Sequence, residues 1–276
     1  MTRTLLSIDR ETRLCMSLSG RPGNFGTRFH NHLYEQLGLN YVYKAFSSRD
    51  LQGAISGIRA LAIRGCGVSM PFKEACVPLV DSLDASAAAI GAVNTIVNDD
   101  GHLRAYNTDY TAVRKLLERH QVAATTRFVL RGSGGMASAV AAALRDQGFR
   151  SGTISARNPD AGRALAGAYG FAWSPTVPAP GAELLINVTP IGMEGGAEVD
   201  QLAFDPAAID AARVVFDVVA LPEETPLVRA ARARGKQVII GGDILVLQGL
   251  EQFVLYTGVR PDEAQVARAA AFALGR

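Results

Sequence analysis

Short apolar runs alternate with longer helical patterns along the first part of the chain. The apolar runs predict β-strands, and apolar residues spaced three or four apart predict helices. The expected strands are Leu14–Leu18, Tyr41–Phe46, Gly65–Met70 and Thr95–Asn98, and the expected helices are Thr27–Leu37, Asp50–Ala62 and Tyr110–His120. Asp50 suits an N-cap and Gly38 a C-cap. This alternation predicts an α/β fold with largely parallel strand pairing.

A second series of strand-like segments begins near Arg127. Its members are Arg127–Arg131, Thr153–Ala156, Glu183–Val188, Val214–Val219 and Gln237–Ile240. The helical pattern Ala137–Gln147 follows the first of them and ends at Gly148. The three prolines of Ser174–Gly181 predict a turn there, not a helix.

The last two patterns are helical. Ile244–Tyr256 predicts a helix that could pack back on the first lobe, and Ala264–Ala273, broken by Arg268, predicts a surface helix. A glycine-rich turn starts only at Gly132, so we expect two α/β domains. The first is residues 1–110, completed by 244–276, and the second is residues 111–243, with the helix near 110–120 as the connector.

Composition narrows the class of protein without deciding its function. The chain has 276 residues, is 48% hydrophobic and carries a formal net charge of +2, so it can build a sizeable core and has no strong charge bias. It contains no Lys/Arg run, and we expect no nucleic-acid partner. Three cysteines, Cys15, Cys66 and Cys76, are too few for a disulfide framework and predict reduced, packed thiols in a cytoplasmic protein. The first six residues lack the apolar core of a signal peptide, and no apolar stretch is long enough to span a membrane.

A dinucleotide-type turn follows the first strand of the second series. Gly132-Ser133-Gly134-Gly135-Met136-Ala137 would allow a tight turn at Gly132, close approach to a pyrophosphate at Gly134, and close helix packing at Ala137. The helix N-terminus would offer unpaired N–H groups to phosphates. A glycine pattern alone is often only a turn, but the strand-turn-helix context favours dinucleotide binding.

The end of the next strand favours NADP over NAD. NAD sites usually place an acidic residue there to bind the ribose 2′-hydroxyl. This chain instead has Arg157-Asn158, and an arginine can bind a 2′-phosphate. The alternative is that Arg157 is an ordinary solvated loop residue.

Polar residues ahead of this turn form a candidate catalytic group. Lys73 closes Ser69-Met70-Pro71-Phe72-Lys73, and Asp109 follows Asn107 and Thr108, with Asn94 between the two motifs. If a helix starts at Pro71, Lys73 projects from its first turn. Taken singly, Lys73 could be an exposed lysine and Asp109 an ordinary N-cap. Together they could hold a hydroxyl group and move its proton.

Other catalytic chemistries lack a signature. No spacing of His and Cys fits a zinc site, and we expect no metal. No Gly-x-Ser-x-Gly motif indicates a serine hydrolase. Gly192-Met193 could face the nicotinamide of a bound cofactor, although its spacing alone indicates only another loop.

These motifs, in this order, resemble those of the shikimate dehydrogenase family over nearly the whole chain. The residues that carry the resemblance are Met70-Pro71-Phe72-Lys73, Gly91-Ala92-Val93-Asn94-Thr95, Asn107-Thr108-Asp109, Gly132-Ser133-Gly134-Gly135, Asn187-Val188-Thr189 with Gly192-Met193, and Gln248.

The resemblance implies an N-terminal α/β substrate domain and a Rossmann-type NADP-binding domain inserted before the last helices. It implies Lys73 and Asp109 as the catalytic pair, with Ser69, Asn94 and Gln248 as substrate ligands. We also assign a group of residues to the cofactor: Gly132, Ser133, Gly134, Gly135, Met136, Ala137, Arg157, Asn158, Asn187, Thr189, Gly192 and Met193.

Two departures point to a divergent, shikimate dehydrogenase-like subgroup. The family usually has Ser-x-Ser-Pro shortly before His-Asn to bind the substrate carboxylate, whereas this chain has Asn24-Phe25-Gly26-Thr27 before His30-Asn31. We keep Asn24 as a substrate ligand. The family also favours a tyrosine in Asp-x-x-Tyr-x-Pro, where this chain has Ala220.

The expected activity is reversible hydride transfer between NADP and a ring hydroxyl of shikimate or a related cyclic hydroxy acid, in a monomer or homodimer. The alternatives are a dehydrogenase for quinate-type or other cyclohexene carboxylates, and a non-catalytic NADP-binding sensor.

Overall fold

The computed structural model describes residues 8–178 and 181–275, in two compact units. The first unit contains the chain up to Thr108 and again from Val246 onward, and the second is Asp109–Leu245. Residues 1–7, on which the prediction of no signal peptide was based, lie outside the described residues, as do residues 179 and 180 of the proline-rich loop.

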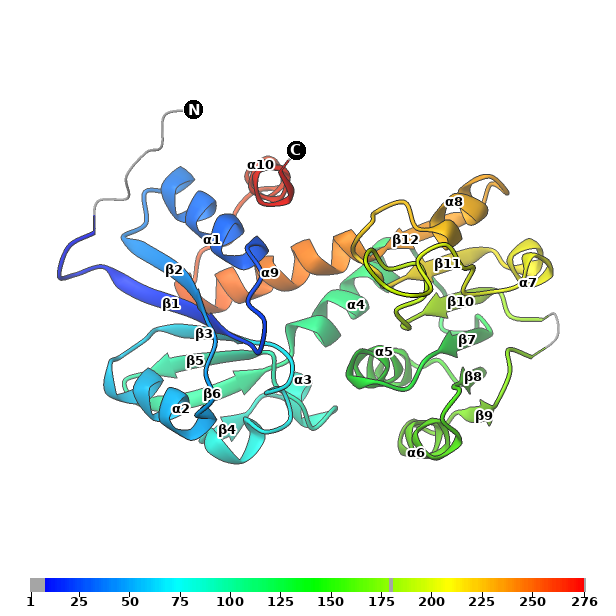
Figure 1. Ribbon diagram of the computed structural model, residues 1–276, viewed down its shortest axis with the longest axis horizontal. Helices are drawn as coiled ribbons and strands as arrows, with labels where there is room; N and C mark the ends of the chain where they lie inside the picture. The colour runs from blue at the N-terminus through cyan, green and yellow to red at the C-terminus, as the bar shows by residue number, and fades with distance from the viewer. Residues whose placement is uncertain (1–7, 179–180, 276) are drawn as a thin grey trace. The chain divides into compact units, whose positions relative to one another are not determined.

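The first unit is built on a six-stranded sheet with the strand order β2-β1-β3-β5-β6-β4 (Figure 1). Most of its ladders are parallel, but β5 runs antiparallel to both β3 and β6. The strands are β1 (Arg13–Leu18), β2 (Tyr41–Phe46), β3 (Gly65–Val68), β4 (Ser82–Leu83), β5 (Thr95–Asp99) and β6 (His102–Tyr106). The helices are α1 (Phe25–Gln36), α2 (Leu51–Ala60), the 3₁₀ turn η1 (Val77–Leu79), α3 (Ala85–Ala88), the larger part of α9 (Gly241–Thr257), and α10 (Glu263–Leu274).

Two apolar layers, one on each face, hold this sheet. On one face, α1, α9 and α10 pack an aromatic cluster that includes Phe29, Tyr43, Phe253 and Tyr256. On the other face, α2 contributes Ile55 and Ile58 to a layer of buried aliphatic and thiol side chains. The chain's three cysteines are buried free thiols, as the sequence predicted. Chain segments from both ends therefore share one core, since α9 and α10 return to the sheet begun by β1.

The second unit is a parallel sheet with the strand order β12-β11-β10-β7-β8-β9. This order is that of a doubly wound dinucleotide-binding fold. The strands are β7 (Phe128–Arg131), β8 (Gly152–Ser155), β9 (Ala172–Ser174), β10 (Leu184–Asn187), β11 (Val214–Asp217) and β12 (Gln237–Ile240). The helices are α4 (Thr108–Arg119), α5 (Gly135–Asp146), α6 (Pro159–Tyr169), α7 (Pro206–Ala211) and α8 (Pro226–Arg232). The predicted α/β class and the Rossmann-type second domain are confirmed.

Two possibilities that the sequence left open around the candidate catalytic residues are not realised in the structure. Residues 70–76 form turns and bends, so no helix starts at Pro71 and Lys73 does not project from a helical first turn. Asp109 is not an N-cap, because α4 already begins at Thr108 and Asp109 lies inside its first turn. Asp50, by contrast, is the N-cap of α2, where its carboxylate accepts a hydrogen bond from the Gly53 amide at 2.8 Å.

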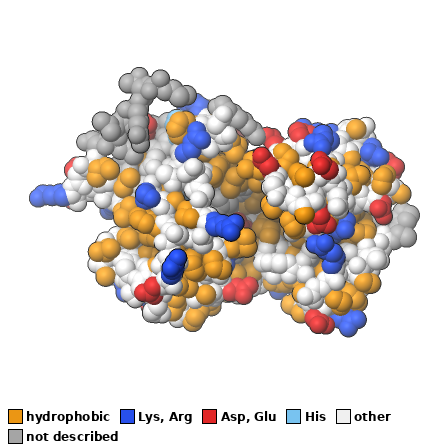
Figure 2. Space-filling model, in the orientation of Figure 1, with side chains coloured by type: hydrophobic (Ala, Val, Ile, Leu, Met, Phe, Trp, Pro, Cys, Tyr) orange, Lys and Arg blue, Asp and Glu red, His pale blue; other side chains and the backbone are white. Residues whose placement is uncertain are grey.

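Charge is spread over the surface, in keeping with the small net charge. On the face drawn in Figure 2, basic and acidic side chains are scattered among hydrophobic and other groups. Within the described residues, no helix is both long enough and apolar enough to cross a membrane.

Candidate functional site

The glycine-rich turn after β7 has the backbone geometry that phosphate binding needs. Gly132 has φ of +126°, and a Cβ there would lie 2.7 Å from Cγ2 of Val188. Gly134 is the N-cap of α5, and a Cβ at Gly134 or Gly135 would meet nothing within 4 Å. Ala137 is fully buried against the sheet. No side chain caps the start of this twelve-residue helix, so the amides of its first turn could bind a phosphate.

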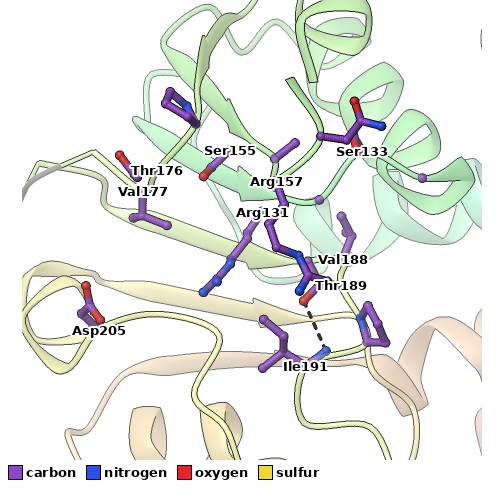
Figure 3. Close-up of a pocket in the computed structure, with 16 residues that line it drawn as sticks. Arg131, Ser133, Ser155, Arg157, Thr176, Val177, Val188, Thr189, Ile191 and Asp205 are labelled. Atoms are coloured by element: carbon purple, nitrogen blue, oxygen red, sulfur yellow. Dashed lines mark hydrogen bonds between the residues drawn. The ribbon is translucent and has the colours of Figure 1, made fainter. Parts of the chain in front are cut away.

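A pocket of about 550 Å³ opens beside this turn, and we call it the nucleotide pocket (Figure 3). It lies where β7, β8 and β10 end, which is the point in the sheet where strand order reverses and nucleotides bind in this type of fold. It is lined by Arg131, Gly132, Ser133, Gly134, Ser155, Ala156, Arg157, Asn158, Pro175, Thr176, Val177, Val188, Thr189, Pro190, Ile191 and Asp205.

Arg157 lines this pocket just beyond the end of β8. Its side chain is 73% exposed, and its Nη1 lies 3.4 Å from Oε1 of Glu198. Asn158 is also the N-cap of α6, since its side-chain oxygen accepts hydrogen bonds from the amides of Asp160 and Ala161. Met136, also assigned to the cofactor, is half-buried in the first turn of α5.

The loop after β10 is fixed by a buried polar network. The Asn187 side chain is fully buried, accepts from the Thr189 hydroxyl at 2.6 Å, and donates to the Asp217 carboxylate at 2.9 Å. Asp217 also accepts from the Thr225 hydroxyl at 2.6 Å, and burial raises the pKa of its carboxyl group. Asn187 thus shapes the loop in this structure, while Thr189 reaches the pocket. Gly192 has φ of +86°, and Met193 is exposed.

One edge of the sheet in the first unit gathers the polar residues expected to bind substrate. The parallel register pairs Leu18 of β1 with Val68 of β3. The antiparallel registers pair Thr95 with Gly67 and with Tyr106. The C-terminal ends of β1, β3 and β6 and the N-terminal end of β5 therefore share this edge. Ser69, Asn94 and Asn107 are the next residues out from those ends.

Asn94 ties this edge together. Its Oδ1 accepts from the Thr108 amide at 2.7 Å and from the Thr95 hydroxyl at 2.8 Å. Its backbone pairs with both neighbours: the Asn94 amide donates to the Tyr106 carbonyl, and the Asn94 carbonyl accepts from the Val68 amide. Directly before it, the Val93 amide donates to the Lys73 carbonyl at 2.8 Å. The backbones of Lys73 and Thr108 are thus both fastened to the Val93–Asn94 dipeptide.

Gln252 also binds this edge, and sequence reasoning did not single it out. Its Nε2 donates to the Asn94 carbonyl at 3.2 Å and to the Thr95 hydroxyl at 3.1 Å. Gln248, the predicted ligand, lies four residues earlier on α9, so it occupies the same face of that helix one turn away. The spacing of the two glutamines was the signal that could have found Gln252.

The remaining predicted substrate ligands lie on loops at the surface of the first unit. Ser69 and Asn24 are exposed. Asn24 is the N-cap residue of α1, but its side chain makes no capping hydrogen bond. Gly26, which stands where the family usually has a serine, leaves a Cβ position 3.4 Å from the Tyr43 ring. Among the described residues, no group of three His, Cys, Asp or Glu side chains is placed to hold a metal ion.

The comparisons with known proteins agree with the motifs. Residues 25–96 match the family described as Shikimate dehydrogenase substrate binding domain. The chain is 56% identical to a shikimate dehydrogenase-like protein of Haemophilus influenzae, over 96% of this chain and 98% of that protein. A solved shikimate 5-dehydrogenase-like protein superposes with a TM-score of 0.95 at 56% identity, covering 97% of this chain and 99% of that one. Thermus thermophilus shikimate 5-dehydrogenase, solved with NADP(H) and shikimate, gives a TM-score of 0.83 at 30% identity, covering 94% and 99%.

Proposed function

Because the chain belongs to the shikimate dehydrogenase family, we propose that it is an NADP-dependent oxidoreductase acting on shikimate or a closely related cyclic hydroxy acid. The reaction is reversible hydride transfer between the nicotinamide and a ring hydroxyl group. In the direction of reduction, it converts 3-dehydroshikimate or a related ring ketone to the alcohol.

The observation that carries this proposal is that the Lys73 and Asp109 motifs both hydrogen-bond to the same two residues, Val93 and Asn94. The Lys73 carbonyl accepts from the Val93 amide, and the Thr108 amide donates to Asn94 Oδ1. Asp109 is the next residue after Thr108, in the first turn of α4. These bonds support Lys73 and Asp109 as a catalytic pair acting beside Asn94.

The proposed chemistry needs one hydride and one proton. In reduction, the hydride leaves the reduced nicotinamide and forms a C–H bond at the carbonyl carbon, while the Lys73 ammonium gives its proton to the carbonyl oxygen. In oxidation, the proton passes from the hydroxyl group to Lys73 as the hydride leaves. Before oxidation, the substrate hydroxyl donates to Asp109, which holds it in place, and the same proton then passes to Lys73 as the hydride leaves. A positioned general acid of this kind contributes roughly 10²–10⁴-fold to the rate.

The nucleotide pocket supports NADP as the cofactor of this reaction. Its lining includes Arg157 at the end of β8, where NAD sites place an acid. The Thermus thermophilus relative was solved with NADP(H). The NADP would place its phosphates at Ser133 and Gly134, before the amides of α5.

The altered carboxylate-binding loop supports weak binding of shikimate itself. Asn24 and Gly26 stand where the family usually has two serines, and Ala220 where it favours tyrosine. Losing a hydrogen bond to a buried charged group costs about 1–3 kcal/mol, which corresponds to a tenfold or greater loss of affinity. The competing substrates in this proposal are quinate-type acids and other cyclohexene carboxylates.

A substrate panel tests the proposal. The purified protein is incubated with shikimate, quinate and related ring hydroxy acids, each with NADP and with NAD, and formation of reduced nicotinamide is followed by absorbance. We expect turnover of at least one ring acid with NADP. If NADP binds but no ring acid is oxidised at saturating cofactor, the protein is a non-catalytic NADP-binding sensor.

The cellular setting is part of the same proposal. The buried free thiols are in keeping with a reducing, cytoplasmic compartment. We propose that the protein acts there on a small-molecule substrate, as a monomer or a homodimer.

A further inference from the structure

We propose that Arg131 is a second ligand for the 2′-phosphate of NADP, acting together with Arg157 and setting the preference for NADP over NAD. This inference rests on the proposed NADP-dependent function and goes beyond it. Arg131 is the last residue of β7, directly before the glycine-rich turn, and the sequence alone presented it as no more than a strand end.

The strand register brings Arg131 beside the segment that carries Arg157. Arg131 pairs with Ser155 across the β7–β8 ladder, and the Gly132 amide donates to the Ser155 carbonyl at 2.8 Å. Arg157 follows Ser155 by two residues. Both arginines line the nucleotide pocket, and Figure 3 shows their side chains in the same part of it.

Arg131 keeps donors for a ligand although it is partly held by the protein. Its Nη1 donates to the Ala203 carbonyl, which fixes the guanidinium inside the pocket. A guanidinium carries five N–H donors in a planar fork, and this contact uses one nitrogen. That geometry suits two oxygens of a phosphate group.

Charge in the pocket points to the same ligand. Burial lowers the pKa of Arg131, and the positive charge of Arg157 lowers it further, while the acidic neighbours Glu198 and Asp205 raise it. Two arginines held this close repel each other, and a phosphate dianion would relieve that repulsion. NAD carries only a hydroxyl group at this position, so it gains little from the second cation.

Glu198 is the counter-ion that the phosphate would replace. Its carboxylate lies 3.4 Å from Arg157, and its backbone carbonyl accepts from the Gly192 amide at 2.9 Å. The loop thus keeps an acid next to Arg157. An ordinary exposed ion pair of this length is weak, so a dianion can displace it.

The test compares the dissociation constants of NADP and NAD for the wild type and for Arg131→Met, measured by isothermal titration calorimetry at one ionic strength. We expect Arg131→Met to weaken NADP binding about tenfold or more, because it removes a charge-assisted hydrogen bond. Binding of NAD should stay essentially unchanged. Arg150→Met is the matched control, since it removes an exposed arginine between α5 and β8 that is not among the pocket residues.

Arg131→Lys is a second variant that tests the inference even if Arg131→Met folds poorly. It keeps the charge and can keep the contact with Ala203, but it lacks the planar fork, so its preference for NADP should fall between those of the wild type and Arg131→Met. Thermal unfolding of each variant verifies that the second unit is intact.

The possible outcomes separate this inference from the proposed function. If the wild type binds NADP and Arg131→Met keeps the same preference for it over NAD, the inference is wrong and the function stands. If Arg131→Met weakens NADP and NAD equally, Arg131 only supports the loop through Ala203, and the inference is again wrong. If the wild type does not bind NADP, the proposed function itself fails.

Discussion

Acidification should destabilise the first unit through one buried histidine, His30. This side chain is fully buried on α1, and its ring stacks on Tyr43 with centroids 4.4 Å apart. Within the described residues, neither ring nitrogen meets the geometry of a hydrogen bond, and the neighbouring Gln252 side chain offsets only part of the effect of burial on the pKa of His30. Burial lowers the pKa of His30 from 6.5 to about 3. The folded protein therefore keeps the ring neutral over a pH range in which the unfolded chain binds a proton.

The sign and size of the effect follow from that difference. Above about pH 6.5 both states are neutral at this site and its effect on stability is zero. As the pH falls from there towards about 3, only the unfolded state gains the proton, so the free energy of unfolding decreases. Each pH unit is worth about 1.4 kcal/mol, so His30 alone should cost about 2 kcal/mol at about pH 5.

Urea unfolding at about pH 7.5 and about pH 5 measures this cost in the wild type and in His30→Phe. The phenylalanine keeps an aromatic ring for stacking and cannot titrate. The variant should lose about 2 kcal/mol less than the wild type on acidification. His102→Phe, at an exposed position in the same unit, serves as the control and should retain most of the wild-type loss. If the free energy of unfolding depends on pH equally in the wild type and in His30→Phe, His30 is not the source of the acid destabilisation.

Three further predictions concern activity. Lys73→Ala should lower turnover by roughly 10²-fold or more yet leave NADP affinity intact, since in the proposed mechanism Lys73 acts on the substrate proton; steady-state rates and calorimetry test this, and retained activity would remove Lys73 from the mechanism. Arg157→Ala should raise the Michaelis constant for NADP by about tenfold, and an unchanged constant would contradict its phosphate-binding role. Asn24→Ser with Gly26→Ser and Ala220→Tyr should lower the Michaelis constant for shikimate, because these changes restore donors for its carboxylate; no decrease would mean that this chain binds its substrate in another way.

Local patterns were enough to predict most of the strands. β2 and β12 begin and end where the sequence predicted, and β1 differs by one residue, because short runs of apolar residues between polar turns carry their own signal. The strand-turn-helix around Gly132 was equally predictable from the sequence, since a glycine with positive φ and a small third residue are local requirements of this turn.

Some elements were missed although their local signals were present. α6 starts with Asn158 as its N-cap and Pro159 at its first position, and it ends at Gly170 with φ of +75°. Sequence reasoning considered Asn158 only as a cofactor ligand, and so overlooked its capping role. The helix that could have started at Pro71 does not form, for the opposite reason. Proline at a first position permits a helix but does not require one, and the segment is instead tied to the sheet by the bond between Lys73 and Val93.

The sequence by itself determined which residue types stand in which order: the glycine-rich turn, the Lys73 and Asp109 motifs, and most of the strands that precede them. Only the tertiary structure decided which of these meet. The antiparallel insertion of β5 lets Asn94, the residue before it, hydrogen-bond to the backbones of both Val68 and Tyr106, and the β7–β8 register places Arg131 near Arg157. Neither pairing leaves a local trace, because strand register depends on hydrogen bonds between segments far apart in the chain and on the packing of whole faces of the sheet.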